Sequence, residues 1–240
     1  MVLQRASGAG ISDIIVPGVA ADSWEALQEV CAGAGADSKG PALHPALGLH
    51  PMFMDAHRRK DLDRLDIDIG QQTPIAVGEC GLDFYHGQDD YDEQMYLFIG
   101  QLELAVQHAL PVIVHSRKSQ DLILRALRQR PGLRAVMHSF SGSEQQAKQL
   151  IELGGYVSFG GPVTYNRAKK LQRLIMSLPL EGIMLESDAP DQPPVSQQGL
   201  RNEPANLADI AAFIAKLRGI PVEKLAGITT QNAQELFALR

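Results

Sequence analysis

The chain is poor in cysteine and has no long apolar run. Its two cysteines, Cys31 and Cys80, match no Cys-x-x-Cys pattern, which argues against a disulfide framework and fits a reducing compartment. The first residues lack the apolar segment of a signal peptide, and no stretch approaches about 18 consecutive apolar residues. The sequence therefore predicts a cytoplasmic protein that has no membrane partner.

An excess of positive charge is also absent. A net charge of −6 over 240 residues gives no broad electrostatic footprint for nucleic acid. It does not exclude a local basic rim, or phosphates that are held by metal ions. The hydrophobic content of 45% and the charged content of 21% are typical of a globular protein with a sizeable core.

Repeats, low-complexity tracts and long linkers are missing, so we expect a single domain over residues 1–240. Strand and helix patterns alternate instead, which predicts an α/β fold with a parallel sheet. The length suits a TIM-type (β/α)₈ barrel. The predicted strands are Ser12–Val16, Ala42–Gly48, Ile75–Glu79, Val112–His115, Ala135–His138, Tyr156–Phe159 and Gly182–Glu186.

These are seven strands, whereas the barrel needs eight, because closure links strand number to tilt and shear. The chain opens on a helical pattern, Val2–Ala9, so we expect the first strand to be missing and to precede Met1. Its absence would expose the edges of the strands near Ser12–Val16 and Gly182–Glu186, and exposed edges pair with other chains. We expect a monomer, with a dimer through this edge as the alternative.

Four apolar runs end in residue types that bind metals. The residues are Glu79, His115, His138 and Asp188. A near-continuous apolar run is typical of a buried parallel strand, and the C-terminal strand ends carry the functional residues of a βα barrel. Two histidines and two carboxylates at one rim predict a divalent-metal hydrolase. A fifth run ends at His50.

The alternation of side chains along a strand predicts which residues face the interior of the barrel with the proposed metal ligands. It places Val77 with Glu79 on the inner face, and Ala76 with Cys80 on the face toward the helices. A lone histidine at a strand end is usually a structural residue, but four ligand types at the same end of four strands favour a metal site. The inner-face partners of the other three ligands are Ile113, Val136 and Met184.

The ordered motifs of the chain resemble those of the TatD-like metal-dependent deoxyribonucleases. The resemblance runs from about Gly10 to Phe237, and its motifs are specific as an ordered set. They are Gly48-Leu49-His50-Pro51, Gly78-Glu79-Cys80-Gly81-Leu82-Asp83, His115-Ser116-Arg117, His138-Ser139-Phe140-Ser141-Gly142, Glu186-Ser187-Asp188-Ala189-Pro190 and Arg201-Asn202-Glu203-Pro204.

The resemblance implies a role for each ligand. Glu79 is similar to a carboxylate that bridges two divalent ions, and His115 and His138 resemble the ligands of one ion. Asp188 resembles a ligand of the other ion that also orients or deprotonates the attacking water. Glu79 and Asp188 are thus the expected catalytic residues.

We expect His50, Arg117 and Arg201 to bind phosphate or leaving-group oxygens. The planar guanidinium of arginine matches phosphate and stays charged. For Arg201 the alternative is a salt bridge with Glu203 or Asp191 that holds its loop, and both interpretations stay open.

Two further groups carry weaker signals. The run His57-Arg58-Arg59-Lys60 is typical of a solvated helix face, and contact with DNA is its alternative. Tyr85 and His86 follow Glu79 closely, and they either line the site or pack within their loop.

The chain departs from the family at one motif, the His-x-His that ends the first strand. None of its seven histidines lies two positions from another. Glu79, His115 and His138 still form a three-ligand set for one ion, while a second ion would keep only Asp188 and a share of Glu79. Our preferred explanation is a shortened N-terminus, which predicts an apolar strand ending in His-x-His upstream of Met1.

The resulting hypothesis is a hydrolase of the deoxyribonuclease type that uses metal-activated water on DNA or a nucleotide phosphoester. The ligand set suits Mg²⁺, Mn²⁺, Zn²⁺ or Ni²⁺, two in the complete family site and one in this chain. One alternative is a metal hydrolase of a small ester, amide or phosphoester. Another is a catalytically inactive barrel that serves as a binding module.

Overall fold

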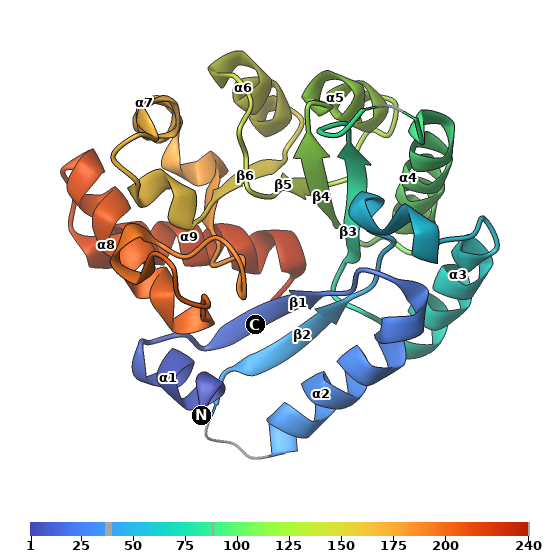
Figure 1. Cartoon of the computed structure of the whole chain (residues 1–240), viewed down its shortest axis with the longest axis horizontal. Helices are drawn as coiled ribbons and strands as arrows, with labels where there is room; N and C mark the ends of the chain where they lie inside the picture. The colour runs from blue at the N-terminus through green and yellow to red at the C-terminus, as the bar shows by residue number, and fades with distance from the viewer. Residues whose placement is uncertain (37–39, 88, 240) are drawn as a thin grey trace.

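The computed structural model describes residues 1–36, 40–87 and 89–239, and within them strands and helices alternate (Figure 1). A strand lies at each of the seven predicted positions, although the ends differ by a few residues. The strands are β1 Asp13–Pro17, β2 Ala42–Ala46, β3 Val77–Asp83, β4 Val112–Arg117, β5 Ala135–Met137, β6 Tyr156–Phe159 and β7 Ile183–Leu185.

Most of the α-helices form an outer layer around the strands (Figure 1). Their ends follow local chemistry: Ser143 and Gln146 form a reciprocal capping box at the start of α6, as their spacing predicts. None of the helices in the described ranges is long and apolar enough to cross a membrane. The helices are α1 Val2–Gly8, α2 Trp24–Ala36, α3 Asp61–Gln72, α4 Tyr91–Gln107, α5 Gln120–Arg128, α6 Glu144–Glu152, α7 Lys169–Ser177, α8 Leu207–Arg218 and α9 Val222–Phe237.

All strand pairings are parallel, but they form two sheets. Strands β3 to β7 pair in sequence order, and β1 pairs with β2 alone. An isolated bridge between Leu47 and Val77 connects the two sheets, together with backbone hydrogen bonds from Ile75 to Pro45 and from Gly78 to Leu47. In the described part of the chain no pairing joins β1 to β7. The fold is therefore α/β with a parallel sheet, and the predicted closed barrel is not confirmed.

The first helix packs against the segment that connects β7 to α8. Helix α1 packs against the short 3₁₀ helix Pro204–Asn206. Arg5 donates two hydrogen bonds, of 2.7 and 2.6 Å, to the carboxylate of Glu203 beside it. The described residues thus give no support to the expectation of a missing first strand.

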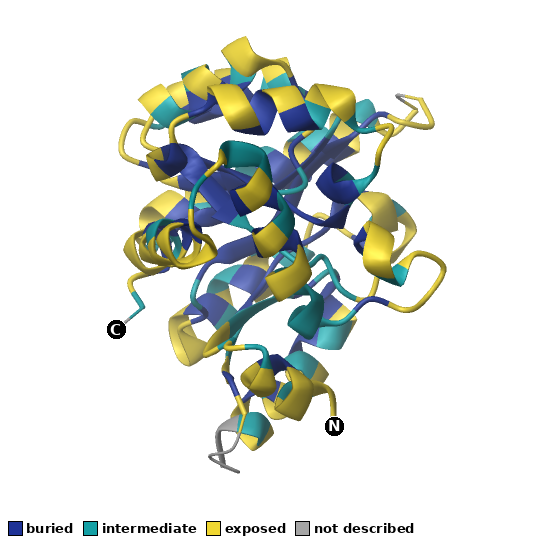
Figure 2. Ribbon diagram, turned by 90° about the vertical axis from the view of Figure 1, so that its left-hand side faces the viewer, coloured by how far each residue is buried: buried dark blue, intermediate teal, exposed yellow. Residues whose placement is uncertain are grey.

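The strands separate two apolar clusters, and Figure 2 shows the buried strands beneath partly exposed helices. The outer cluster lies between sheet and helices, and the inner cluster lies behind the other face of the strands. Ile113, Val136 and Met184 belong to the inner cluster, as alternation predicts. Leu236 and Phe237 of α9 complete it.

The prediction for Val77 and Ala76 is wrong. Val77 lies in the outer cluster and Ala76 in the inner one. The cause is a register shift in β3 between Val77 and Cys80. An irregularity of this kind changes the side of the sheet on which the preceding side chains lie.

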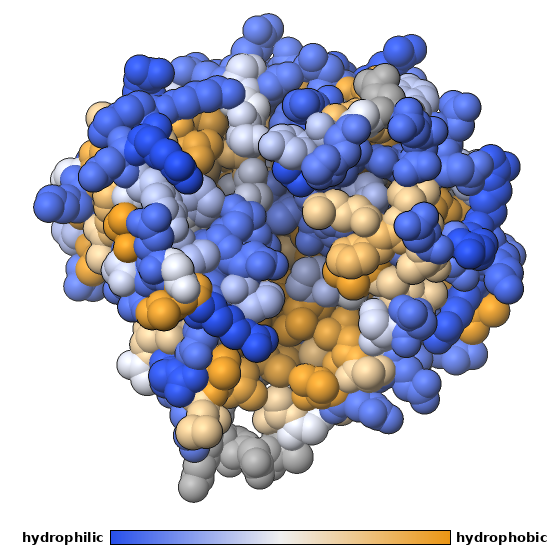
Figure 3. Space-filling view, in the orientation of Figure 1, coloured by the Kyte–Doolittle hydropathy of each residue, from blue (hydrophilic) through white to orange (hydrophobic). Residues whose placement is uncertain are grey.

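The two-stranded sheet is less covered than the larger one. Strand β1 has no fully buried residue, whereas every residue of β3 and β6 is buried. Figure 3 shows apolar surface gathered in a hollow of the molecular face near β1 and β2. The loop after β2 therefore needs support from other elements.

Gln101 of α4 supplies that support. Its Oε1 accepts a hydrogen bond of 2.7 Å from the Leu49 amide, and its Nε2 donates to the carbonyls of Leu49 and Leu97 at 3.2 Å. The side chain is completely buried. It fixes the backbone immediately before His50, so helix packing determines where that histidine lies.

We predict that Gln101→Leu lowers the free energy of unfolding by about 2 kcal/mol, because it leaves both buried polar groups of Leu49 without partners. Urea unfolding followed by circular dichroism measures the change. Gln107→Leu is the control, since Gln107 is exposed on the same helix and bonds to Asp66. Equal stability of the two variants would contradict this role for Gln101.

Candidate metal centre

The site is built around the carboxylate of Glu79 in β3. Three imidazole nitrogens face its Oε1 atom: His50 Nε2 at 2.9 Å, His115 Nδ1 at 3.2 Å and His138 Nε2 at 2.6 Å. The structure thus brings together Glu79, His115 and His138, which the sequence grouped. It also places His50 with them, although the sequence analysis assigned His50 to phosphate oxygens.

Glycines allow the strands that carry these residues to approach closely. Gly78 has a φ of +153°, and a Cβ there would lie 2.7 Å from the Ile113 carbonyl oxygen. Gly81 has a φ of +147°, and a Cβ there would lie 2.1 Å from the His115 carbonyl oxygen. Any larger residue would push β3 away from β4. The glycines on either side of Glu79 therefore set its distance from His115.

A carboxylate also holds the second nitrogen of two of these histidines. His115 Nε2 lies 2.8 Å from Asp83 Oδ2, and His138 Nδ1 lies 3.7 Å from Glu186 Oε2. Glu186 itself accepts hydrogen bonds from the Ser139 amide, at 2.8 Å, and from the Ser158 hydroxyl. Carboxylates in this position orient metal-binding histidines and increase their basicity.

Backbone groups orient His50 in the same way. The Met52 amide donates a hydrogen bond of 3.1 Å to Nδ1 of His50, so Nε2 carries the hydrogen and donates it to Glu79. His57 Nε2 in turn donates to the His50 carbonyl at 2.9 Å. The Met52 amide thus fixes the His50 ring, and His57 fixes the His50 backbone.

Burial and proximity change the pKa values of these groups strongly. Burial alone would raise the pKa of Glu79, but the charge of His138 and hydrogen bonds from the three histidines hold this pKa well below its usual range. Burial opposes a charged His138, but Glu79 and Glu186 raise its pKa well above the usual value. A buried carboxylate therefore stays ionised because positive charge surrounds it.

The pKa of Asp83 is lowered to about 2. Burial acts against this ionisation, and hydrogen bonds from His115 and the Tyr85 amide outweigh it. The matching effect raises the pKa of His115, where burial is overcome by Asp83 and Glu79. Asp83 and His115 thus form a buried pair beside Glu79, in which each residue favours the charged form of the other.

The pKa of Asp188 is raised, in contrast to the lowered pKa of Asp83. Burial raises its pKa, the charge of His138 opposes that increase, and the charges of Glu186 and Glu79 add to it. Its backbone is in the left-handed region at a φ of +54°, and its carboxylate accepts a hydrogen bond from Gln192. Asp188 therefore lies within electrostatic range of the cluster, and its carboxylate holds a proton more readily than an ordinary one.

The structure places the two predicted arginines differently. Arg117 Nη1 lies 3.4 Å from Asp83 Oδ2, at the edge of the cluster. Arg201 is exposed in the loop after β7, and in the described ranges no side-chain hydrogen bond or ion pair holds it. The alternative salt bridge with Glu203 does not form, because Glu203 pairs with Arg5.

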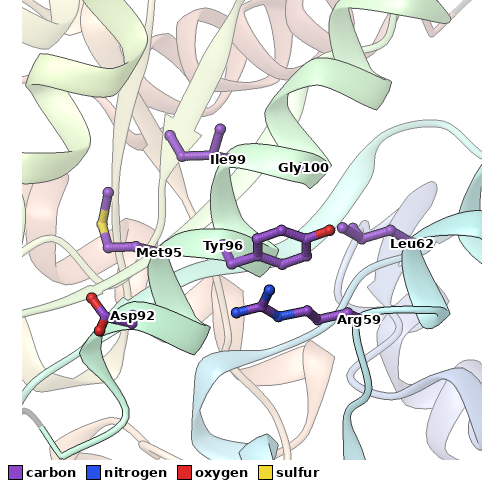
Figure 4. Close-up of a pocket in the computed structure, with 7 residues that line it drawn as sticks. All are labelled: Arg59, Leu62, Asp92, Met95, Tyr96, Ile99 and Gly100. Atoms are coloured by element: carbon purple, nitrogen blue, oxygen red, sulfur yellow. The ribbon is translucent and has the colours of Figure 1, made fainter.

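The basic run at residues 57–60 is not a free cationic surface. His57 is buried behind His50. Arg59 makes a two-point ion pair with Glu93, of 3.0 and 2.6 Å, and its guanidinium lies 4.1 Å from the Tyr96 ring centroid (Figure 4). Most of this run is therefore engaged by the protein itself.

The donor set fits a divalent cation. The ligand atoms of His50, Glu79 and His115 lie within 4.8 Å of one another, and all three residues are buried. His115 Nδ1 and His138 Nε2 are 3.3 Å apart and face the same carboxylate oxygen. Lone pairs that converge on one point repel one another unless protons or a metal ion lie between them. A set of imidazole and carboxylate ligands suits Mn²⁺, Zn²⁺ and Ni²⁺.

Comparison with known proteins places this site in a family. A family model described as TatD related DNase matches residues 1–238. The chain belongs to the TatD family. It is 37% identical over 238 residues to YjjV of Escherichia coli, an uncharacterized metal-dependent hydrolase, and the match covers 98% of this chain and 90% of YjjV.

Other TatD-family relatives agree. A mouse protein named as a candidate deoxyribonuclease, TATDN3, is 30% identical over 248 residues, which cover 98% of this chain and 81% of that protein. The crystal structure of YjjV superposes with a TM-score of 0.91 at 36% identity, covering 100% of this chain and 91% of that one. The predicted family is confirmed, and the protein is a TatD-family metal-dependent hydrolase.

Asp83 and Glu186, which position the histidines, were not among the residues predicted for the site, although the sequence contains a signal for them. Asp83 lies four positions after Glu79, so both side chains share one face of β3. Glu186 lies two positions before Asp188, and in the structure its carboxylate accepts hydrogen bonds from Ser139 and Ser158 and faces His138 at 3.7 Å.

We predict that Asp83→Asn weakens binding of Mn²⁺ by roughly 10- to 100-fold, because the loss of a carboxylate behind a ligating histidine has an effect of that size. Isothermal titration of chelator-treated protein measures it. Asp66→Asn is the matched control, since Asp66 forms an equivalent pair with His108 at 2.5 Å on the outer helices. Unchanged affinity in Asp83→Asn would show that Asp83 does not support the site.

Proposed function

We propose that this TatD-family protein is a metal-dependent phosphodiesterase of the deoxyribonuclease type, acting on DNA or a nucleotide phosphoester. The observation that carries the proposal is the convergence of three imidazole nitrogens on Glu79 Oε1. The family description and the name of the mouse relative point to the same substrate. The name of YjjV supports metal-dependent hydrolysis.

Glu79, His115 and His138 would hold one divalent ion, and His50 would donate its Nε2 hydrogen to Glu79 beside them. Asp188 and a share of Glu79 would contribute to a second. A bound cation of this kind supplies positive charge to the phosphodiester oxygens and makes water a stronger acid. The ionised state of Glu79 suits it to this role, because it carries negative charge throughout the usual pH range.

Asp188 is the proposed base. Its raised pKa favours the acceptance of a proton from the attacking water, and its partly exposed position leaves it accessible to that water. Arg117 would donate hydrogen bonds to phosphate oxygens from the edge of the cluster, where its side chain is partly exposed. Arg201 would add a second such donor from its exposed loop.

We predict that the full chain cleaves DNA with Mg²⁺ or Mn²⁺, that chelation abolishes cleavage, and that Asp188→Asn lowers kcat by about 10²- to 10⁴-fold through loss of the base. Metal content and cleavage should be measured on the same samples. Asp191→Asn, an exposed residue of the same loop, is the control. Hydrolysis of small esters or amides without DNA cleavage would exclude the proposed substrate and favour a small-molecule hydrolase.

A further inference from the structure

Tyr85 is an exposed aromatic residue that lies two positions after the end of β3. The residue keeps 52% of its surface accessible. The Arg117 guanidinium carbon lies 4.0 Å from the ring centroid, and Lys118 Nζ lies 5.1 Å from it. The His86 ring meets Tyr85 edge-on, at 4.9 Å and 86°. One ring thus carries two cations and still faces solvent.

A single carboxylate connects this ring to the metal centre. Asp83 accepts hydrogen bonds from the Tyr85 amide at 2.9 Å, from Arg117 at 3.4 Å and from His115 Nε2 at 2.8 Å. His115 is the next residue inward, and its other nitrogen faces Glu79. The Tyr85 ring is therefore linked to His115 of the metal centre through Arg117 and Asp83.

Packing within the loop does not account for this arrangement, because a ring that serves to fill space is buried. The loop is fixed by its backbone instead: Asp83 holds the Tyr85 amide, and Lys118 Nζ donates to the Tyr85 carbonyl at 3.4 Å. An exposed, oriented ring beside two cations has the features of single-strand nucleic-acid sites, in which bases stack on aromatics and cations hold the backbone.

We propose that Tyr85, Arg117 and Lys118 form a stacking shelf for one base of a single-stranded nucleic acid whose phosphate reaches the metal centre. This proposal rests on the proposed phosphodiesterase function and assigns the contact with an unpaired base to these three residues. A base inside a duplex has both faces covered by its neighbours, so it cannot stack on the shelf without leaving the helix.

The chain contains a matched control for the shelf. Tyr96 is 44% exposed and has Arg59 at 4.1 Å from its centroid. This pair lies between the start of α3 and helix α4 (Figure 4), and Glu93 neutralises its arginine. Both tyrosines are therefore exposed, and each has an arginine over its ring. They differ because the arginine at Tyr96 is neutralised by Glu93, and because only Tyr85 is connected to the metal centre.

The test is fluorescence anisotropy of a labelled single-stranded oligonucleotide, confirmed intact after the measurement, with the full chain. Tyr85→Leu is expected to weaken binding about ten-fold, which corresponds to the loss of one base–aromatic stack. Tyr85→Phe keeps the ring and Tyr96→Leu leaves the shelf intact, so both should bind like wild type. Thermal unfolding of each variant checks the fold.

A second probe isolates the base. The same strand with abasic sites should bind wild type about ten-fold more weakly, and Tyr85→Leu should bind both strands alike. Equal binding of the two strands by wild type, or an equal loss in Tyr85→Leu and Tyr96→Leu, would overturn the shelf.

Hydrolysis of bis(p-nitrophenyl) phosphate, which has no base, separates this proposal from the one it rests on. Metal-dependent hydrolysis of this ester without any preference for the base-containing strand refutes the shelf and keeps the phosphodiesterase. Preference for that strand without hydrolysis in any divalent metal keeps the shelf as a binding site and refutes the phosphodiesterase.

Discussion

The arrangement of the site depends on one buried oxygen atom, Oε1 of Glu79, which three imidazoles face. A buried carboxylate is costly unless charge and hydrogen bonds compensate it, and here both come from histidines on other elements. Each histidine is in turn held at its far side, by Asp83, by Glu186 or by backbone amides. The strand ends must therefore meet at this point for any of these groups to be satisfied.

The fold shows why these strand ends could be predicted from the sequence. Apolar runs that stop at a polar residue mark the strands, and all seven positions hold strands, although β3 continues past Glu79 to Asp83 and β4 past His115 to Arg117. The face of β3 could not be predicted, because the register shift between Val77 and Cys80 interrupts alternation. Closure could not be predicted either, since it depends on pairings between distant strands, and β1 pairs with β2 alone.

The site was predictable to the extent that its residues follow apolar runs. Glu79, His115 and His138 were grouped on that basis, whereas the place of His50 depends on a loop that Gln101 and His57 fix from outside. Such side-chain to backbone contacts leave no periodic signal. Arg201 illustrates the same limit, because the choice of Glu203 between Arg5 and Arg201 is made by the packing of α1.

Two arginine–tyrosine pairs have similar geometry, but the carboxylate beside each arginine determines whether its guanidinium can still bind a ligand. At Arg59 and Tyr96 a surface glutamate satisfies the guanidinium with two short hydrogen bonds, so little charge remains for a ligand. At Arg117 and Tyr85 the nearby carboxylate is Asp83, which bonds more closely to His115, at 2.8 Å, than to Arg117, at 3.4 Å. Asp83 therefore binds His115 of the metal centre more tightly than it binds Arg117. The guanidinium of Arg117 thus keeps N–H donors that can bind a phosphate.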